Sequence, residues 1–502
     1  MTRGPSRETS ARLSVVCLVA IVAGFATAGW WAVMHFDPIS GYDGEAFIGY
    51  ASALDRTGRI PSESETYEYA APPAYFSGAI YAQHLARWVD GGEGSLLPGS
   101  PSPLRRALWA LVAVAGALLV AFGTSRLRQG AGVALGLIAV LWALADALSL
   151  AGNGQWRSGQ LLALFWGAVL IVLTWLLARE AWPDQPLMWT LSALAIAVLP
   201  IVIRMSVMFH PETQVAALCL AAVLLAVRSR RLGWHLEGAI GVGAALGLAA
   251  LTRQSTLAVA VGIGLGVILV GGRRAARFTA VAAAAMLLVA GPWWAYETHR
   301  TGNPIQSNLS RPNKMLDHQP RSFYVSFPIR DLVRHPYREA FNDELLPRIH
   351  ADIWSDWAGG IHGYWVQPTK HGPFFASTQS VLGFFADVLC LGGLAVIGGH
   401  GLMRARRGVG SSAEVVLGVG LVVALVTWAA FVVELVRFPQ FDGDPIKATY
   451  MLFLGPIFVL GGIAAGRALC RSTPWLGFAF ATWAILYAAS FAGHLASAFA
   501  GY

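Results

Sequence analysis

Residues 13–34 read LSVVCLVAIVAGFATAGWWAVM, an apolar stretch without a charged side chain. A helix needs about 20 apolar residues to cross the hydrocarbon core of a bilayer, so the stretch predicts a membrane-spanning helix near the start of the chain. Its length exceeds the apolar core of a signal peptide, and we therefore expect the helix to be retained.

Similar runs recur throughout the 502 residues, of which 56% are hydrophobic and only 13% charged. This composition excludes an ordinary soluble globular protein and predicts an all-α polytopic membrane protein of about thirteen transmembrane helices. The predicted limits are 13–35, 107–125, 131–151, 160–178, 187–203, 211–227, 236–251, 254–271, 277–297, 379–402, 413–436, 448–467 and 474–498. Thr252-Arg253-Gln254 separates the seventh run from the eighth, either as a tight turn or as a kink in one span.

The runs divide the chain into three parts. We expect an N-terminal transmembrane module (1–297) that contains a first long loop (36–106), a second long loop (298–378) and C-terminal helices (379–502). Both loops are too long for simple connections, and apolar residues at helical spacing around 46–51 and 79–82 predict short interfacial helices in the first.

Arginine clusters predict the orientation. The formal charge of +8 arises from short clusters between apolar runs, which argues against nucleic acid as a partner. With thirteen helices, all the clusters fall on the face of the N-terminus, and positively charged short loops stay cytoplasmic. The long loops are then extracytoplasmic, and the Ala-, Gly- and Arg-rich composition favours a bacterial plasma membrane. The clusters are Arg3/Arg7/Arg12, Arg126/Arg128, Arg228/Arg230/Arg231, Arg273/Arg274/Arg277, Arg404/Arg406/Arg407 and Arg467/Arg471.

Two acids follow the first predicted helix, in FDPISGYDGEAF at residues 36–47. Asp43 and Glu45 are candidate catalytic residues, because a carboxylate at the membrane boundary can accept a proton from an attacking hydroxyl or hold a divalent cation such as Mg or Mn. The alternative interpretation is a pair of solvated loop acids or a helix cap.

An aromatic turn occupies residues 67–76, YEYAAPPAYF. Two prolines favour an extended, stiff conformation between Tyr69 and Tyr75, which suits the wall of a sugar or isoprenoid groove. An interfacial aromatic belt is the alternative.

The order of these features resembles the first external loop of GT-C superfamily glycosyltransferases, such as protein O-mannosyltransferases and lipid A aminoarabinose transferases. The resemblance is closest over Asp43 to Phe76 and extends loosely over the chain through the helix count and the two long loops. Many relatives have an adjacent Asp-Glu pair where this chain has Asp43-Gly44-Glu45, and a His or Gln where it has Ala71. The resemblance implies inverting transfer from a polyprenyl-phosphate sugar.

Such a transfer needs cations at the phosphate, and arginine offers a planar fork for its oxygens. Arg204, Arg253 and Arg437 are candidates on the predicted outer face, although each is equally consistent with snorkelling to headgroups. Lys447 is one of only three lysines and lies on the outer face against the positive-inside trend. Relatives carry a basic residue and a nearby Tyr at a similar turn, so the resemblance implies that Lys447 and Tyr450 contact the donor phosphate.

His210 and Glu212 are predicted to shape the same pocket. The alternatives are a packing histidine, and a carboxylate near the positive end of a helix that begins at Pro211.

The second loop contains DIWSDWAGGIHGYW at residues 352–365. Aromatic faces stack on sugars while carboxylates and His bind hydroxyls, so we expect this run to receive the acceptor. Packing of the loop onto the membrane surface is the alternative. The predicted acceptor residues are Trp354, Asp356, Trp357 and His362.

The resulting hypothesis is a hexosyl- or pentosyltransferase with Asp43 as general base and Glu45 as its helper. Its partners would be the polyprenyl-phosphate donor, a glycan, lipid or protein acceptor, and membrane lipids. One rival is a transporter or lipid flippase, which would place charges on broken helices at mid-bilayer. The other rival is a non-catalytic scaffold.

Overall fold

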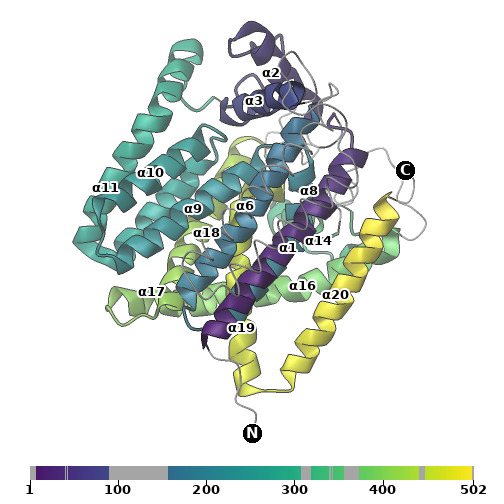
Figure 1. Cartoon of the computed structure of the whole chain (residues 1–502), viewed down its shortest axis with the longest axis vertical. Helices are drawn as coiled ribbons and strands as arrows, with labels where there is room; N and C mark the ends of the chain where they lie inside the picture. Colours follow the sequence, from purple (N-terminus) through teal and green to yellow (C-terminus); the bar gives the residue numbers. More distant parts are fainter. Residues whose placement is uncertain are drawn as a thin grey trace.

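The computed structural model (Figure 1) describes residues 7–39, 41, 43–89, 156–306, 318–337, 341, 343–355, 372–439 and 447–499. Within these ranges the regular structure is helical throughout, which confirms the predicted all-α class. The elements are α1 (Arg7–His35), α2 (Gly44–Thr57), α3 (Ala74–Val89), α6 (Arg157–Ala181), α7 (Pro186–Ala197), α8 (Pro200–Val207), α9 (Glu212–Arg231), α10 (Leu236–Ala250), α11 (Thr256–Thr301), α12 (Arg321–Val325), α13 (Ile329–Arg334), α14 (Leu345–Trp354), α16 (Gly372–Gly393), η4 (Leu394–Gly398), α17 (Gly399–Arg406), α18 (Ser412–Arg437), η5 (Ala448–Leu454), α19 (Gly455–Ser472) and α20 (Leu476–Phe499).

Eight helices of the described part are long and apolar enough to cross a membrane, and the bent pair α7 and α8 makes a ninth if it forms one span. The chain is therefore a multi-pass membrane protein. The runs predicted at 107–125 and 131–151 lie outside the described residues, whereas every other predicted run falls on a helix. The count of thirteen stays a prediction.

The 46-residue α11 consists of two helices that run back along each other. Gly272 has φ 59° and ψ −139°, a conformation that interrupts a helix and that glycine adopts readily. A Cβ placed on Gly264 would lie 3.1 Å from the side chain of Thr279, whereas 15 residues of straight helix would separate them by about 22 Å. The predicted division between 254–271 and 277–297 is thus confirmed.

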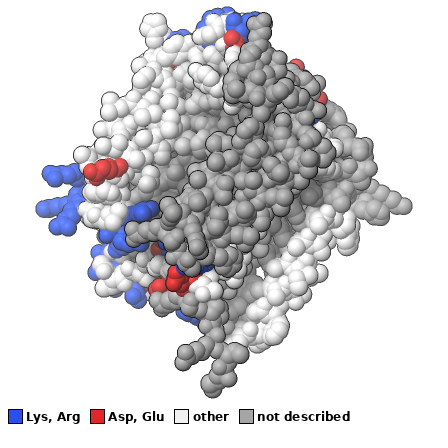
Figure 2. Space-filling model, viewed as in Figure 1, with Lys and Arg blue, Asp and Glu red and all other residues white. Residues whose placement is uncertain are grey.

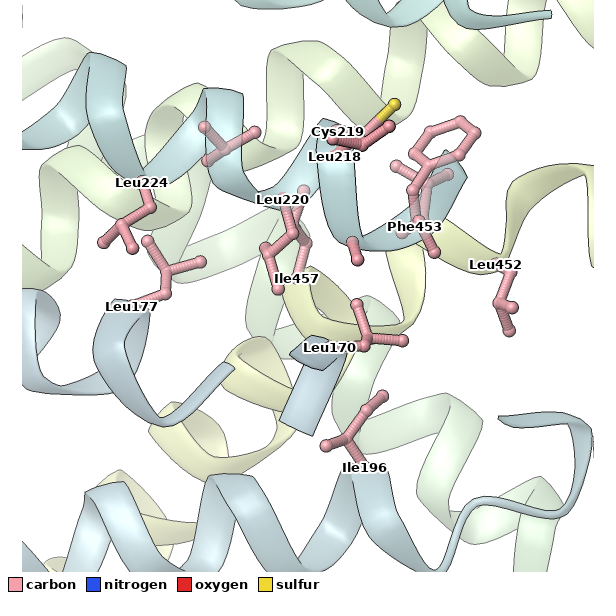
Figure 3. Packing of buried hydrophobic residues seen from close by; sticks show 14 of the residues in the cluster. Leu170, Leu177, Ile196, Leu218, Cys219, Leu220, Leu224, Leu452, Phe453 and Ile457 are labelled. Carbon is pink, nitrogen blue, oxygen red and sulfur yellow. The ribbon is translucent and has the colours of Figure 1, made fainter. Parts of the chain in front are cut away.

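The core is formed mainly by α6, α9, α7 and α19, whose buried aliphatic side chains interdigitate (Figure 3). Leu170 and Leu220 are at most 1% exposed, and Ile457 of α19 lies among them in the close-up. At the crossing of α16 and α19, a Cβ on Gly393 would collide with the carbonyl oxygen of Gly461. Small residues permit this close backbone approach, as is common between membrane helices.

The arginine clusters near α9, α11 and α17 gather at one end of the molecule. Trp234, after α9, packs on Phe278 with ring centroids 5.2 Å apart, and α17 packs against α11. Figure 2 shows these side chains in blue at the lower left. Because α10 is 15 residues long, Arg253 beyond its far end lies about 22 Å away. The structure therefore separates an arginine-rich end from the end that carries Arg253.

The short helices predicted in the first loop are present as α2 and α3. Their apolar faces bury Phe47, Tyr50 and Phe76 in one small cluster, and Tyr50 stacks on Phe76 with ring centroids 4.2 Å apart. The Ala74 N–H donates to the carbonyl oxygen of Leu251, 2.9 Å away. This contact holds the pair of helices beside the turn between α10 and α11.

Candidate active site

Asp43 immediately precedes α2 but does not cap it through its side chain. Its backbone is left-handed, with φ 54° and ψ 14°, a conformation that Asp and Asn tolerate better than most residues. The side chain points instead to Lys447, whose Nζ donates to Oδ2 at 2.9 Å across 404 positions of sequence. Asp43 therefore occupies the N-cap position of α2, as the alternative interpretation expected, but its carboxylate does not cap the helix.

The Asp43–Lys447 ion pair is largely shielded from water, because the lysine side chain is 3% exposed and the aspartate 23%. Burial alone would raise the pKa of Asp43, but the charge and hydrogen bond of Lys447, aided by the charge of Arg253, lower it to about 2. At neutral pH this carboxylate is ionised.

Arg253 lies in the turn between α10 and α11, at the edge of the same group of charges. Its Nε lies 3.0 Å from Oε1 of Glu212, the first residue of α9, and its Cζ lies 5.0 Å from the ring centroid of Tyr450. Burial would lower the pKa of Arg253, but the charge of Glu212 outweighs it and raises the pKa, so the guanidinium stays protonated. Arg253 thus contacts both of the other predicted residues, Glu212 and Tyr450.

His210 is fully buried between α8 and α9, and neither ring nitrogen has a hydrogen-bond partner among the described residues. Its ring meets Phe47 edge-on, with centroids 4.9 Å apart. Burial and then the charge of Arg253 hold the pKa of His210 well below its usual value, against the opposing effect of Asp43. The imidazole is therefore neutral and retains unused hydrogen-bonding capacity next to the ion pair.

A cavity of about 590 Å³ opens at the first turns of α2. Asp43 and Glu45 both line it, together with Glu65 and Tyr67 from the segment between α2 and α3. Glu45 is exposed, whereas Glu65 accepts hydrogen bonds from Nη1 and Nη2 of Arg59, each at 3.0 Å. The cavity gives a small polar molecule access to the Asp43 carboxylate.

Asp43 and Glu45 were also the predicted ligands of a divalent cation. Among the described residues, no three His, Cys, Asp or Glu side chains converge as metal ligands, and Oδ2 of Asp43 accepts from an ammonium group. The donor set at hand does not match the oxygen-rich shell that Mg²⁺ or Mn²⁺ takes.

Arg204, predicted to bind phosphate, is fully buried and so does not snorkel. Its Nη2 donates to Oδ1 of Asp352 at 2.6 Å, and Oδ2 of Asp352 accepts from the backbone N–H of Ala448 at 2.7 Å. Arg437, at the end of α18, is exposed, with its Cζ 5.3 Å from the ring centroid of Phe438. These two arginines therefore occupy very different environments.

The two predicted groove tyrosines have structural contacts. Tyr75 is fully buried, donates to the carbonyl oxygen of Gly159 at 3.0 Å and so ties α3 to α6. Tyr69 lies under Arg300, whose Cζ is 5.6 Å from the ring centroid and whose Nη1 donates to the Tyr69 carbonyl at 3.3 Å.

Of the predicted acceptor residues, Asp356, Trp357 and His362 lie outside the described residues. Trp354 is 7% exposed, and its Nε1 donates to Oδ1 of Asp387 at 2.9 Å. Its ring packs edge-on against Tyr487, with centroids 5.9 Å apart. In this structure Trp354 is a core residue at the end of α14.

Sequence reasoning missed two buried acids near the site. Glu68 is 7% exposed and lies close enough to Arg253 to help raise its pKa. Asp352 is fully buried between Arg204 and Ala448. Glu68 lies between two tyrosines, and Asp352 directly precedes Ile-Trp, so both acids belong to segments that were selected for their aromatic residues. An acid inside such an aromatic segment was the sequence signal that could have identified them.

The fold and site together define a multi-pass helical membrane protein with a carboxylate and two cations gathered at the end opposite its arginine clusters. No family model matches the chain, and no curated protein matches it. Among solved structures, ArnT from Cupriavidus metallidurans is similar, both bound to undecaprenyl phosphate and in the apo state. Each shares 13% identity with a TM-score of 0.39, over 91% of this chain and 79% of the other.

Proposed function

We propose that the protein is an inverting glycosyltransferase that moves a sugar from a polyprenyl-phosphate donor to an acceptor hydroxyl. The observation that supports this most is the meeting of Asp43 with Lys447, beside Arg253 and at a cavity. A base for a hydroxyl and cations for a phosphate are the two requirements of such a transfer. The proposal also rests on the resemblance of residues 43–76 to GT-C enzymes.

In the proposed reaction, the proton of the acceptor hydroxyl passes to the carboxylate of Asp43. The hydroxyl oxygen then bonds to the anomeric carbon of the sugar. The bond from that carbon to the phosphate oxygen breaks, and its electron pair stays on the phosphate, which leaves as polyprenyl monophosphate. Lys447 and Arg253 stabilise the charge that develops there.

The Asp43–Lys447 ion pair implies that the donor binds before the acceptor is deprotonated. The donor phosphate and Asp43 are both anions and compete for the same ammonium group. As the phosphate takes Lys447, the pKa of Asp43 returns from about 2 toward its ordinary value, which makes the carboxylate a stronger base. Donor binding would thus prepare the base for the acceptor.

The remaining assignments follow from the charge pattern. We place the arginine end in the cytoplasm and the cavity on the extracytoplasmic side of a bacterial plasma membrane. Acceptors there include envelope glycans, lipids and proteins, and Glu45 on the cavity wall would contact the acceptor or the sugar.

A lipid flippase is a second candidate, and one observation favours it. Helices α7 and α8 form a broken span bent by 58°, and the second of them carries the buried Arg204. Discontinuous helices with buried charge are typical of transporters. The pairing of Arg204 with Asp352 leaves this charge already neutralised.

The test uses purified protein in liposomes with a panel of sugar-labelled polyprenyl phosphates and envelope extracts as acceptors. We expect labelled product and free polyprenyl monophosphate from the wild type and neither from Asp43→Asn. The matched control is Glu180→Gln, which removes another ion-paired carboxylate, 3.3 Å from Arg231 at the arginine end. Full turnover by folded Asp43→Asn would disprove the proposal, and lipid movement without transfer would favour the flippase.

A further inference from the structure

A lysine is a poor anchor for a phosphate unless its backbone is fixed, because its flexible side chain loses much conformational entropy on binding. In this chain Lys447 directly precedes η5, and its own backbone is extended, with φ −124° and ψ 118°. Oδ2 of Asp352 accepts from the N–H of Ala448 at 2.7 Å. That N–H belongs to the planar peptide unit that joins Lys447 to Ala448, so the bond fixes the peptide plane next to the lysine.

Asp352 is itself held from its other side. Arg204 donates to its Oδ1 at 2.6 Å, and both side chains are 0% exposed. A buried carboxylate without a counter-charge is costly, whereas a paired and hydrogen-bonded one has few alternative positions. Asp352 therefore connects three elements at one point, namely α8 through Arg204, α14 through its own backbone, and η5 through Ala448.

Helix α14 is anchored independently of this contact. His350 Nδ1 lies 2.7 Å from Oδ2 of Asp387, and Trp354 Nε1 donates to Oδ1 of the same residue at 2.9 Å. Asp387 is on α16, so these bonds fix the helix on either side of Asp352 along the chain. Asp352 then presents its carboxylate from a rigid support.

We propose that Asp352, backed by Arg204, is a positioning residue that fixes the Lys447–Ala448 peptide and thereby holds the lysine ammonium at Asp43 and at the donor phosphate. This inference rests on the proposed function, because the phosphate belongs to the proposed donor. The position of the Lys447 ammonium group can be tested without an activity assay. It also gives Arg204 a task different from direct phosphate binding.

Removing Asp352 alone would take a counter-charge away from the buried Arg204, which risks misfolding. Two double variants avoid this: Arg204→Met with Asp352→Asn, and Arg204→Met with Asp352→Leu. Both remove the buried charges, and Asn and Leu have nearly the shape of Asp. Only Asn keeps an oxygen that can accept from the Ala448 N–H.

The first readout is the rate at which an amine-reactive ester labels Lys447, measured by mass spectrometry of the full-length protein. The chain has only three lysines, and Lys314 and Lys370 serve as internal references. In the wild type Lys447 is 3% exposed and should react slowly. We expect the Asn double variant to label near the wild-type rate and the Leu double variant about fivefold faster, the factor expected for one lost hydrogen bond.

Thermal unfolding first establishes that both double variants are folded. Equal labelling rates of Lys447 in the two folded variants would overturn the proposal. The labelling rate does not depend on whether the protein transfers sugars. A failure of the positioning proposal therefore appears in the labelling experiment, whereas a failure of the proposed function appears in the transfer assay of the wild type.

The second readout is the pH dependence of kcat/KM. If Lys447 leaves Asp43 in the Leu double variant, the acidic limb should move to higher pH, because the ammonium no longer lowers the pKa of Asp43. The Asn double variant should keep the wild-type limb. A role in stability alone would lower the activity of both variants without moving the limb, and that result would also overturn the proposal.

Discussion

One buried polar cluster surrounds His350 on α14, and another surrounds Lys447 just before η5. The two clusters differ in how many of their polar atoms have hydrogen-bond partners. His350 uses both ring nitrogens, with Asp387 at 2.7 Å and the Ser380 hydroxyl at 3.2 Å. His210, near Asp43 and Lys447, is fully buried, and neither of its ring nitrogens bonds to a residue in the described part of the chain. The first cluster holds helices together, whereas the second keeps unused hydrogen-bonding capacity beside a cavity. In a helical membrane protein, burial of charge alone does not identify a site.

The largest expected effect comes from removing the proposed base. Asp43→Asn should lower kcat by roughly 10²- to 10⁴-fold in the liposome transfer assay, the range typical of a lost general base. Asn is the suitable replacement because it tolerates the left-handed backbone at φ 54°. Glu180→Gln should retain activity, and a similar loss in both variants would point to a general effect of altered charge.

Lys447→Met should act next most strongly, on donor binding. A charge-assisted hydrogen bond to phosphate is worth about 1.5–3 kcal/mol, which corresponds to a rise in donor KM of roughly 10- to 150-fold. The matched control is Arg231→Met, which removes another ion-paired cation at the arginine end. Unchanged donor binding in Lys447→Met would remove the lysine from the phosphate site.

A change in the cluster around His350 should lower the stability of the protein and leave catalysis unchanged. Asp387→Asn weakens the contact with His350 and should lower the free energy of unfolding by about 1–3 kcal/mol, measured by thermal unfolding in detergent. The acidic limb of the transfer reaction should stay in place. A shifted limb in Asp387→Asn would show that the two clusters are electrostatically coupled.

The smallest effect is the pH dependence of stability. The pKa of Asp43 in the folded protein is about 2 against an ordinary value of 3.8, so its ion pair stabilises the fold above pH 3.8, and the contribution is lost as the pH falls toward 2. The loss should be at most about 2 kcal/mol. In Lys447→Met this component should disappear, and an unchanged acid transition would contradict the ion pair.

The helical runs were predictable because hydropathy is local. Thr252-Arg253-Gln254 marked the turn between α10 and α11, and the arginines at 273–277 marked the reversal within α11. Gly272, which makes that reversal, was not distinguishable from the other glycines of its run. A local pattern locates a break in hydropathy but not the residue whose backbone turns.

The site was predictable only where a residue was unusual for its position. Lys447 stood out because lysines are rare and because it opposes the positive-inside trend. Its contact with Asp43 spans 404 positions, and that of Arg204 with Asp352 spans 148, so a single sequence gives neither pairing. Trp354 drew attention as an aromatic residue in a loop, but helix α14 turns it into the core.

The left-handed backbone at Asp43 has a consequence for how the sequence can drift. Glycine would adopt φ 54° at no steric penalty, whereas an aspartate there gives up roughly 1 kcal/mol of folding stability. Selection for thermal tolerance therefore acts on Asp43 in two opposed directions, because Asp43→Gly relieves the backbone but takes the counter-charge away from the buried Lys447. A library screened for heat resistance should therefore keep this aspartate in the wild type and lose it more readily in Lys447→Met, where the ion pair is absent.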